Sequence, residues 1–221
     1  MGQDVRGATA SPVGVPLYLR GGGPLKFLTV EPDDVLEMAM KLATELKESG
    51  YTPDVLVTIL RGGMVIARYL SDFLDVRDIR SIRVEHYSAL EKREGARILE
   101  PLRQRLDGKK VLIVDDVADT GESLAEAIKH VREMGASEIK VVTLHYKPWS
   151  KVTPDFFCQE TRSWVIYPWE YAETARFLLE SLTAEEGMSK EEAIQVILND
   201  AKIPERVVRW LGLLEGEPSR K

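Results

Sequence analysis

The sequence has few of the features that mark secreted or membrane-spanning proteins. Its 221 residues include one cysteine, Cys158, so no disulfide can form within the chain and a reducing compartment is expected. No run approaches the roughly 20 apolar residues needed to cross a bilayer. Residues 1–24 contain neither the charged nor the apolar region of a signal peptide. We therefore expect a cytoplasmic protein that does not enter a membrane.

The sequence also lacks the clustered positive charge that nucleic-acid binding usually requires. The chain carries 30 Lys and Arg residues against 36 Asp and Glu residues, a net charge of -6, and no dense basic block. Proteins that bind nucleic acids usually present such a patch. We expect no nucleic-acid partner, and a small anionic ligand held by local geometry. The single asparagine, Asn199, beside 30% charged residues leans towards a thermophilic composition.

Hydrophobic patterning predicts a parallel α/β protein. Pro32 begins a helix with apolar residues spaced by three and four, and Gly50 ends it. Continuous apolar runs predict strands that are buried on both faces. Strands are expected at 54–60, 79–87, 111–114, 138–146 and 163–167, with helices at 64–74 and after residue 121. This alternation predicts a parallel twisted sheet flanked by helices, with ligands bound beyond the carboxyl ends of the strands.

The remaining segments predict the domain organisation. Residues 1–24 are rich in Gly, Pro, Ser and Ala, which is typical of a flexible leader. Residues 25–171 are expected to form one domain with a small hood, and residues 172–221 a helical C-terminal extension. In that extension Ser189 begins a capping box and Pro204 starts a short helix. Its apolar helices need a surface to cover them, either the chain's own core or a second copy, and we expect a homodimer.

The strongest functional signal follows the strand at 111–114. Asp115 and Asp116 come directly after it, and residues 118–123 then begin a helix. Backbone N–H groups at a helix N-terminus, aided by the helix dipole, can hold a phosphate dianion. Gly121 allows close backbone approach, and hydroxyl groups within the same segment add donors. The two carboxylates suit vicinal ribose hydroxyls, directly or through a metal ion.

This segment resembles the phosphoribosyl pyrophosphate signature of type I phosphoribosyltransferases. Arg61-Gly62-Gly63 is similar to the pyrophosphate loop of that family. Lys147-Pro148-Trp149 and residues 164–170 resemble the base-recognition elements of the xanthine-guanine and hypoxanthine-guanine enzymes, especially the short archaeal-type ones. One motif alone indicates the superfamily, whereas four in this order point to 6-oxopurines. The resemblance covers residues 27–171.

The resemblance implies a magnesium-dependent purine salvage enzyme. Such an enzyme transfers the 5-phosphoribosyl group from phosphoribosyl pyrophosphate to guanine, hypoxanthine or xanthine and releases pyrophosphate. Asp119 is implied as the general acid/base at purine N7, and Lys147 as the donor to the 6-oxo group. Trp164 is implied to stack on the purine ring, and the carbonyl of Val165 to accept a base N–H.

The resemblance also implies the groups that hold the other substrate and the metal. Phosphoribosyl pyrophosphate is assigned to Arg61, Gly62, Asp115, Asp116, Ala118, Asp119, Thr120, Gly121, Glu122 and Ser123. The implied Mg²⁺ ligands are Asp115, Asp116 and Glu170. Residues 88–108 are charged, show no clear period, and are expected to form a mobile loop that excludes water as a lid. The chain departs from the family pattern at His86, where a related bacterial enzyme has Ser, and at Glu170, where Asp is common.

Other interpretations remain beside this one. Asp115-Asp116 and Lys147-Pro148 also resemble a response-regulator receiver domain, but about 30 residues separate them where a receiver needs about 100. A regulator that keeps the fold and binds a nucleotide as a signal is an alternative, because a fold does not prove an activity. Adenine and orotate transferases share the phosphate loop, and Lys147 with Trp164 separates this chain from them. Trp169 is assigned to the core, and the three histidines lack metal-ligand spacing.

Overall fold

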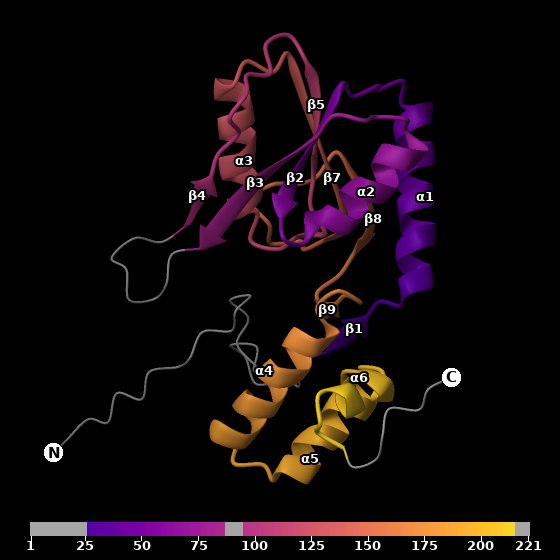
Figure 1. The fold of residues 1–221 in the computed structure, drawn as a ribbon, viewed down its shortest axis with the longest axis vertical. Helices are drawn as coiled ribbons and strands as arrows, with labels where there is room; N and C mark the ends of the chain where they lie inside the picture. Colours follow the sequence, from indigo (N-terminus) through magenta and orange to yellow (C-terminus); the bar gives the residue numbers. More distant parts are fainter. Residues whose placement is uncertain (1–25, 87–94, 215–221) are drawn as a thin grey trace, which may run out of the picture. The chain divides into compact units, whose positions relative to one another are not determined.

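The computed structural model describes residues 26–86 and 95–214, which divide into two units. The larger, called here the sheet unit, comprises Asp33–Arg162. The smaller, called the helical unit, comprises residues 26–32 and 163–214 of the described chain. Figure 1 follows the chain through both units. The chain passes from the sheet unit to the helical unit at Ser163. The flexible leader at residues 1–24 and the boundary between a domain at 25–171 and an extension at 172–221 stay predictions.

The sheet unit is built on a mostly parallel sheet, which confirms the predicted fold class. Its strands run in the order β4-β3-β2-β5-β7-β6, and β8 also pairs with β7. All pairings are parallel except that of β4 with β3. The strands are β2 (Val55–Leu60), β3 (Ile79–His86), β4 (Ala96–Glu100), β5 (Lys110–Val114), β6 (Val117–Ala118), β7 (Glu138–Tyr146) and β8 (Phe156–Glu160).

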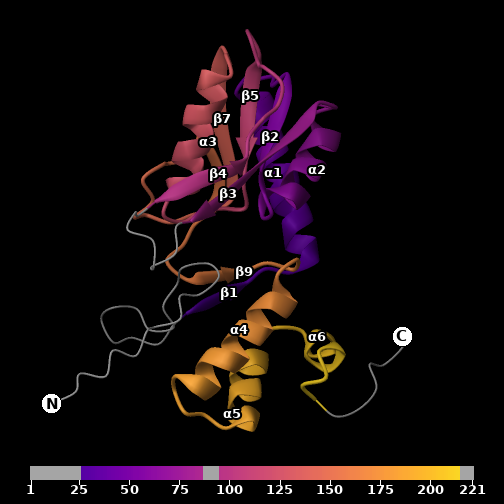
Figure 2. The ribbon, with the colours of Figure 1, turned by 60° about the vertical axis from the view of Figure 1, so that its left-hand side comes forward.

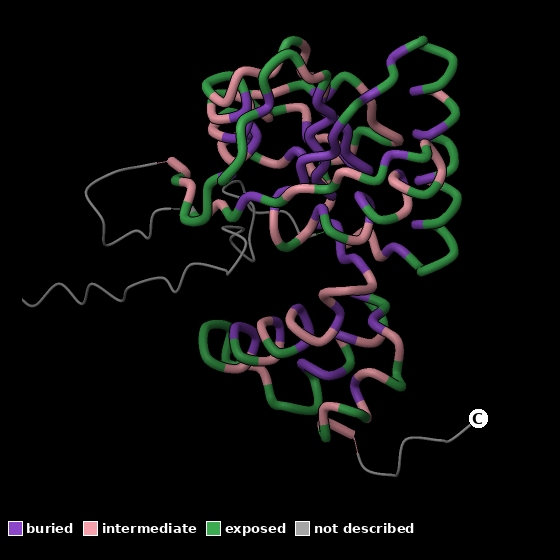
Figure 3. Tube along the Cα trace, turned by 45° about the horizontal axis from the view of Figure 1, so that its top comes forward, coloured by how far each residue is buried: buried purple, intermediate pink, exposed green. Residues whose placement is uncertain are grey.

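Helices cover both faces of this sheet. In Figure 2, α3 (Glu122–Glu133) lies on one side, and α1 (Pro32–Glu48) and α2 (Gly63–Phe73) lie on the other. Because side chains alternate along a strand, β2 turns every second residue towards α3. The core cluster on that face contains Val55, Val57, Ile59, Leu124, Ala127 and Val131. The central strands are buried on both faces, as the purple tube in Figure 3 shows, which explains their unbroken apolar sequences.

The helix boundaries follow from local chemistry that the sequence already shows. Pro32 occupies the first turn of α1, where a missing N–H costs nothing, and two aspartates in that turn suit the helix dipole. Gly135 follows the end of α3 with a φ of 95°, a left-handed conformation that favours glycine. Its position is also crowded, since an added Cβ there would collide with the Asp107 carboxylate.

The prediction of a loop over residues 88–108 is wrong for part of that segment. Residues 96–100 form β4, an edge strand whose side chains are exposed or half-buried, so that no hydrophobic period marks it in the sequence. Leu102 and Leu106 then enter the core beside α3. His130 on α3 accepts the backbone N–H of Leu102 at 3.0 Å. Residues 88–94 of the predicted lid lie outside the described residues, so the lid stays a prediction.

The helical unit has a core of its own. In it β1 (Phe27–Thr29) pairs in parallel with β9 (Trp164–Ile166), so the predicted strand at 163–167 forms but belongs to a separate sheet. The chain continues through α4 (Tyr171–Ala184), α5 (Lys190–Gln195), the π-helix η1 (Val196–Asp200) and α6 (Glu205–Trp210). The capping box at Ser189 and the helix start at Pro204 are confirmed. None of the described helices is both long enough and apolar enough to span a membrane.

The burial of Leu106 in the core predicts how its substitution changes the free energy of unfolding. Leu106 is fully buried, whereas Leu99 on β4 is 38% exposed. Leu106→Ala should lower the free energy of unfolding by about 2–5 kcal/mol, because it removes buried methyl groups and leaves a cavity. Leu99→Ala, the matched control, should change it by less than about 1 kcal/mol. Urea unfolding curves of both variants measure this, and equal midpoints would show that the segment is not anchored in the core.

Candidate active site

The sheet places the glycine-rich motif that follows β2 beside the acidic motif that follows β5. Strands β2 and β5 are parallel neighbours, with Thr58 opposite Val114. After β2 the chain adds β3 and β4 on one side, and after β5 it adds β7 and β8 on the other. The strand order therefore reverses between β2 and β5. Parallel sheets bind ligands beyond the carboxyl ends of their strands at such a switch point, which is where Arg61-Gly62-Gly63 and Asp115-Asp116 lie.

Close packing at this point requires both glycines. A Cβ added to Gly62 would overlap the Asp116 carboxylate, and one added to Gly63 would overlap the carbonyl oxygen of Val114. Gly63 also begins α2, so the turn from strand to helix passes directly over the neighbouring strand. Arg61, at the start of this turn, is exposed and follows a cis peptide bond. The structure therefore attributes these glycines to close contact with β5 and the turn after it.

The two aspartates are both nearly buried, at 8% and 9% exposure. The Asp115 carboxylate accepts the backbone N–H of Asp116 at 3.1 Å and is also hydrogen-bonded by the backbone N–H of Gly63. Burial, followed by the charge of Asp116, raises the pKa of Asp115 well above its ordinary value, and these hydrogen bonds oppose the rise. A positive charge at this pair would relieve the repulsion between the two carboxylates.

The predicted phosphate cradle begins α3. Gly121 is the N-cap residue, with a φ of 78°, and it has no side chain to accept the N–H groups of the first turn. Thr120 and Asp119 precede it, exposed and half-buried respectively, and Ala118 is buried in β6. Glu122 forms an ion pair with Lys151 at 2.7 Å. The structure therefore combines a helix N-terminus, a left-handed glycine and hydroxyl groups in one short segment, as anion binding requires.

A second loop, residues 147–152, packs against this cradle. The backbone N–H of Lys147 donates to Ala118 at 3.0 Å, and that of Lys151 donates to Thr120 at 2.9 Å. An added Cβ on Gly121 would lie 2.6 Å from Ser150 Oγ and 2.7 Å from the backbone nitrogen of Val152. Gly121 is therefore needed for contact with this loop as well as for its backbone conformation.

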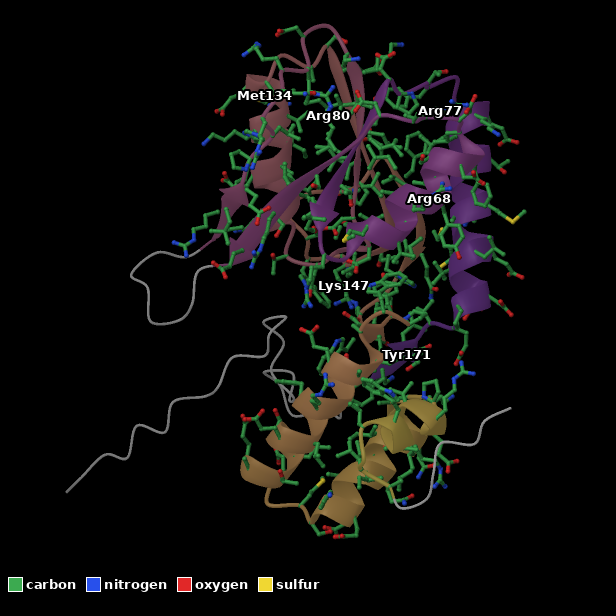
Figure 4. All side chains as sticks on the ribbon, in the orientation of Figure 1. Arg68, Arg77, Arg80, Met134, Lys147 and Tyr171 are labelled. Carbon is green, nitrogen blue, oxygen red and sulfur yellow. The ribbon has the colours of Figure 1, made fainter. Side chains whose placement is uncertain are left out.

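Lys147, Trp149 and Asp119 meet where these two loops join. The indole Nε1–H of Trp149 donates to Asp119 Oδ1 at 3.0 Å. Lys147 Nζ lies 5.6 Å from the centre of the indole ring. Lys147 is only 4% exposed, and burial lowers its pKa, while the charge of Asp119 acts in the opposite direction. Figure 4 shows Lys147 at one end of the sheet unit, opposite the end where Met134 and Arg80 lie.

His145 is a buried residue directly behind this cluster. It is fully buried near the end of β7, and burial, aided by the charge of Lys147, lowers its pKa to about 4. The imidazole is therefore neutral near pH 7, so that it places no second positive charge beside Lys147.

The remaining predicted site residues belong to the helical unit. Trp164 is 7% exposed and packs in that unit's core, with ring centres 5.8 Å from Phe27 and 5.5 Å from Phe177. Val165 is also buried. Glu170 accepts the backbone N–H of Tyr167 at 3.1 Å. Trp169 is half-buried and stacks on Tyr167, with ring centres 4.7 Å apart. The roles of Trp164, Val165 and Glu170 in binding stay predictions.

The structure thus brings together a large part of the predicted site and adds one residue to it. Within the sheet unit, the turns after β2 and β5 adjoin, and Lys147 lies beside Asp119. Among the residues that the structure describes, no group of three or more His, Cys, Asp or Glu side chains could hold a metal ion. Trp149 belongs to the base-recognition motif of the sequence, but the resemblance assigned it no role of its own. Its place next to Lys147 in the same short motif is the signal that could have identified it.

Comparison with known proteins identifies the family. The model of the phosphoribosyl transferase domain matches residues 33–175. The chain belongs to the phosphoribosyltransferase family. This match spans the glycine-rich turn after β2 and the acidic turn after β5. It also spans the 147–152 loop and the segment from Trp164 to Glu170. The resemblance found in the sequence is therefore confirmed at the level of the family.

Relatives and solved structures agree with this assignment. A xanthine-guanine phosphoribosyltransferase of Nitratidesulfovibrio vulgaris is 31% identical over 134 residues, covering 60% of this chain and 77% of the relative. One from Idiomarina loihiensis is 29% identical over 117 residues, covering 52% and 70%. The crystal structure of a purine phosphoribosyltransferase from Pyrococcus horikoshii is 36% identical with a TM-score of 0.60, covering 65% of this chain and 93% of that chain.

The buried histidine of this phosphoribosyltransferase predicts a specific acid sensitivity. The folded-state pKa of His145 is about 4, below the ordinary value of 6.5, so the unfolded chain takes up this proton first as pH falls. Stability that is present above about pH 6.5 is therefore lost towards pH 4, and amounts to about 2 kcal/mol between pH 7 and pH 5.

His145→Gln should remove that part of the pH dependence. Urea unfolding at pH 7 and at pH 5 gives the change in the free energy of unfolding with pH for the wild type and for the variant. Subtracting one change from the other cancels the contributions of other groups. The wild-type free energy of unfolding should fall by about 2 kcal/mol more than that of the variant. An equal fall in both proteins would mean that His145 is not held neutral by burial.

Proposed function

We propose that this phosphoribosyltransferase transfers the 5-phosphoribosyl group from phosphoribosyl pyrophosphate to a 6-oxopurine and releases pyrophosphate, as a purine salvage enzyme. The observation that carries the proposal is the Lys147 ammonium, buried beside Asp119 at the edge of the phosphate cradle. An ammonium donates hydrogen bonds and accepts none. It can therefore donate to the carbonyl of a 6-oxopurine, whereas the 6-amino group of adenine is itself a donor.

The reaction assigns each sequence motif a separate task. The bond from ribose C1 to pyrophosphate breaks, and a bond from C1 to the purine nitrogen forms. Residues 118–123 hold the 5′-phosphate at the start of α3, and Asp115 with Asp116 receives the ribose hydroxyls. Asp119 accepts the proton that the base loses at N7. Arg61 and Gly62 hold the pyrophosphate, with Arg61 placing a positive charge where negative charge develops.

The residues present fit a magnesium ion that binds together with the substrate. Mg²⁺ keeps several waters and commonly uses one or two carboxylates plus substrate phosphates, so a three-residue protein cluster is not required. Burial and then the charge of Asp116 raise the pKa of Asp115, and a divalent cation would relieve the repulsion between the two carboxylates. Asp116, pressed against Gly62, and Asp115 are the proposed ligands. When bound, the ion supplies charge neutralisation for the departing pyrophosphate.

The helical unit contributes residues to the same proposal through the family resemblance. Trp164 stacks on the purine, the Val165 carbonyl accepts a base N–H, and Glu170 is a further metal ligand. The packing of Trp164 between Phe27 and Phe177 would hold its indole rigidly. A cytoplasmic location and a homodimer also stay predictions. Much of the apolar surface that motivated the dimer, including Leu178, Ile197 and Val208, is buried within the helical unit itself.

Steady-state assays with four bases test the proposed reaction. With phosphoribosyl pyrophosphate and Mg²⁺, the wild-type protein should convert guanine, hypoxanthine or xanthine to nucleotide and should leave adenine unused. Excess EDTA should abolish turnover, because the described residues place too few fixed cations at the site to neutralise a leaving pyrophosphate. Full activity in EDTA, or a preference for adenine, would contradict the proposal.

Two substitutions separate the roles of the central residues. Asp119→Asn keeps the shape of the side chain and should lower kcat by roughly 10²- to 10⁴-fold, with the KM for phosphoribosyl pyrophosphate within a small factor. Lys147→Ala should instead raise the KM for the base and relax discrimination against adenine. Lys140→Ala is the matched control, because Lys140 lies near the amino end of β7 and pairs with Asp155. If Asp119→Asn mainly weakens phosphoribosyl pyrophosphate binding, Asp119 serves the cradle instead.

A further inference from the structure

Trp149 links the two side chains that the proposed function assigns to the base. Its indole nitrogen donates to Asp119 Oδ1 at 3.0 Å. The centre of its ring lies 5.6 Å from Lys147 Nζ and 6.0 Å from the guanidinium carbon of Arg162, within the range of cation–π attraction. Asp119 precedes α3 and Lys147 follows β7, so one side chain contacts functional groups from two different elements.

The backbone around Trp149 forms a hydrogen-bonded turn, and Trp149 itself is 47% exposed. The N–H of Ser150 donates to the Lys147 carbonyl at 2.9 Å, which closes a turn around Pro148 and Trp149. Lys151 is tied to the cradle through the carbonyl of Thr120. Gly121 leaves the space in which this turn packs. The turn is therefore fixed relative to the segment that carries Asp119.

The type of contact matters as much as its position. An indole N–H is a donor only and does not ionise in the working range of an enzyme, so it cannot exchange the proton that Asp119 handles. A lysine or arginine in its place would form an ion pair and compete for the charge of the carboxylate. Because the indole engages Oδ1, and a carboxylate offers several acceptor positions on two oxygens, Oδ2 can still accept a base N–H.

We propose that Trp149 is a positioning residue for the transfer reaction, which holds the Asp119 carboxylate in one rotamer through its indole N–H and supports Lys147 with its ring face. This inference rests on the proposed function. It adds a residue that exchanges no proton with the substrate and acts only through Asp119 and Lys147. Asp119 is only half-buried, so its side chain would otherwise be free to rotate. A misplaced acid/base costs rate because the reacting atoms lose their alignment.

Two variants of Trp149 separate the donor from the ring. Trp149→Phe keeps an aromatic face for Lys147 and removes the N–H, so kcat should fall by roughly 10- to 100-fold while the KM values for base and phosphoribosyl pyrophosphate change little. Trp149→Leu removes both functions and should also raise the KM for the base. Trp210→Phe is the control, because Trp210 is 68% exposed in the helical unit, and it should leave kcat unchanged.

A double-mutant cycle distinguishes positioning from a general structural role. In an Asp119→Asn background, Trp149→Phe should lower kcat by less than about twofold, because the group that it orients is already lost. A Trp149→Phe protein with wild-type kcat would overturn the proposal. So would a loss of the same size in both backgrounds, since that would place the effect in the packing of the ring.

An NMR measurement tests the contact without relying on activity. In ¹⁵N-tryptophan-labelled full-length protein, the Nε1–H cross-peak of Trp149 is assigned by its absence in Trp149→Phe. Asp119→Ala should move this cross-peak upfield, as expected for an N–H that loses a carboxylate acceptor, and should leave that of Trp210 in place. An unmoved Trp149 cross-peak would overturn the inference. A wild-type protein that shows the contact but makes no nucleotide would instead contradict the proposed function, and with it the catalytic purpose of Trp149.

Discussion

The parallel pairing of β2 with β5 is the constraint on which the rest of the site depends. Because these strands are neighbours in register, the turns that follow them must share one small space. That space admits no side chain at Gly62 or Gly63, since Asp116 and the Val114 carbonyl occupy it. The same pairing sets where the strand order reverses, so that α2 and α3 leave the sheet on opposite faces (Figure 2). A ligand site at the carboxyl edge follows directly from this topology.

Burial of charge is the second physical feature of the site. Asp115 and Lys147 are both nearly inaccessible, and burial moves the pKa of each towards its neutral form. In the proposed reaction Asp115 interacts with a metal ion and ribose hydroxyls, and Lys147 donates to a purine carbonyl. Buried groups with shifted pKa values are common at functional sites.

Local signals in the sequence were sufficient for the central strands, for α1 to α3 and for the order of the motifs. The apolar runs at 54–60 and 111–114 predicted buried strands, and Pro32 and Ser189 marked helix starts correctly, because caps and central strands depend on neighbouring residues. The sequence failed at β4, which is an exposed edge strand without a hydrophobic period, and at residues 102 and 106, whose burial depends on α3. It also assigned the strand at 164–166 to the main sheet, since pairing with β1 involves residues more than 130 positions away.

The sequence by itself determined the fold class, the family and the residue types of the candidate site, because each depends on spacing along the chain. Tertiary structure alone decided which of these residues touch. Only the folded sheet presses Asp116 against Gly62, and only the loop after β7 brings the Trp149 indole to Asp119, 30 positions earlier. Contacts of this kind have no periodicity and no local motif. They arise because parallel strands distant in sequence end at the same edge of one sheet, where their loops must pack together.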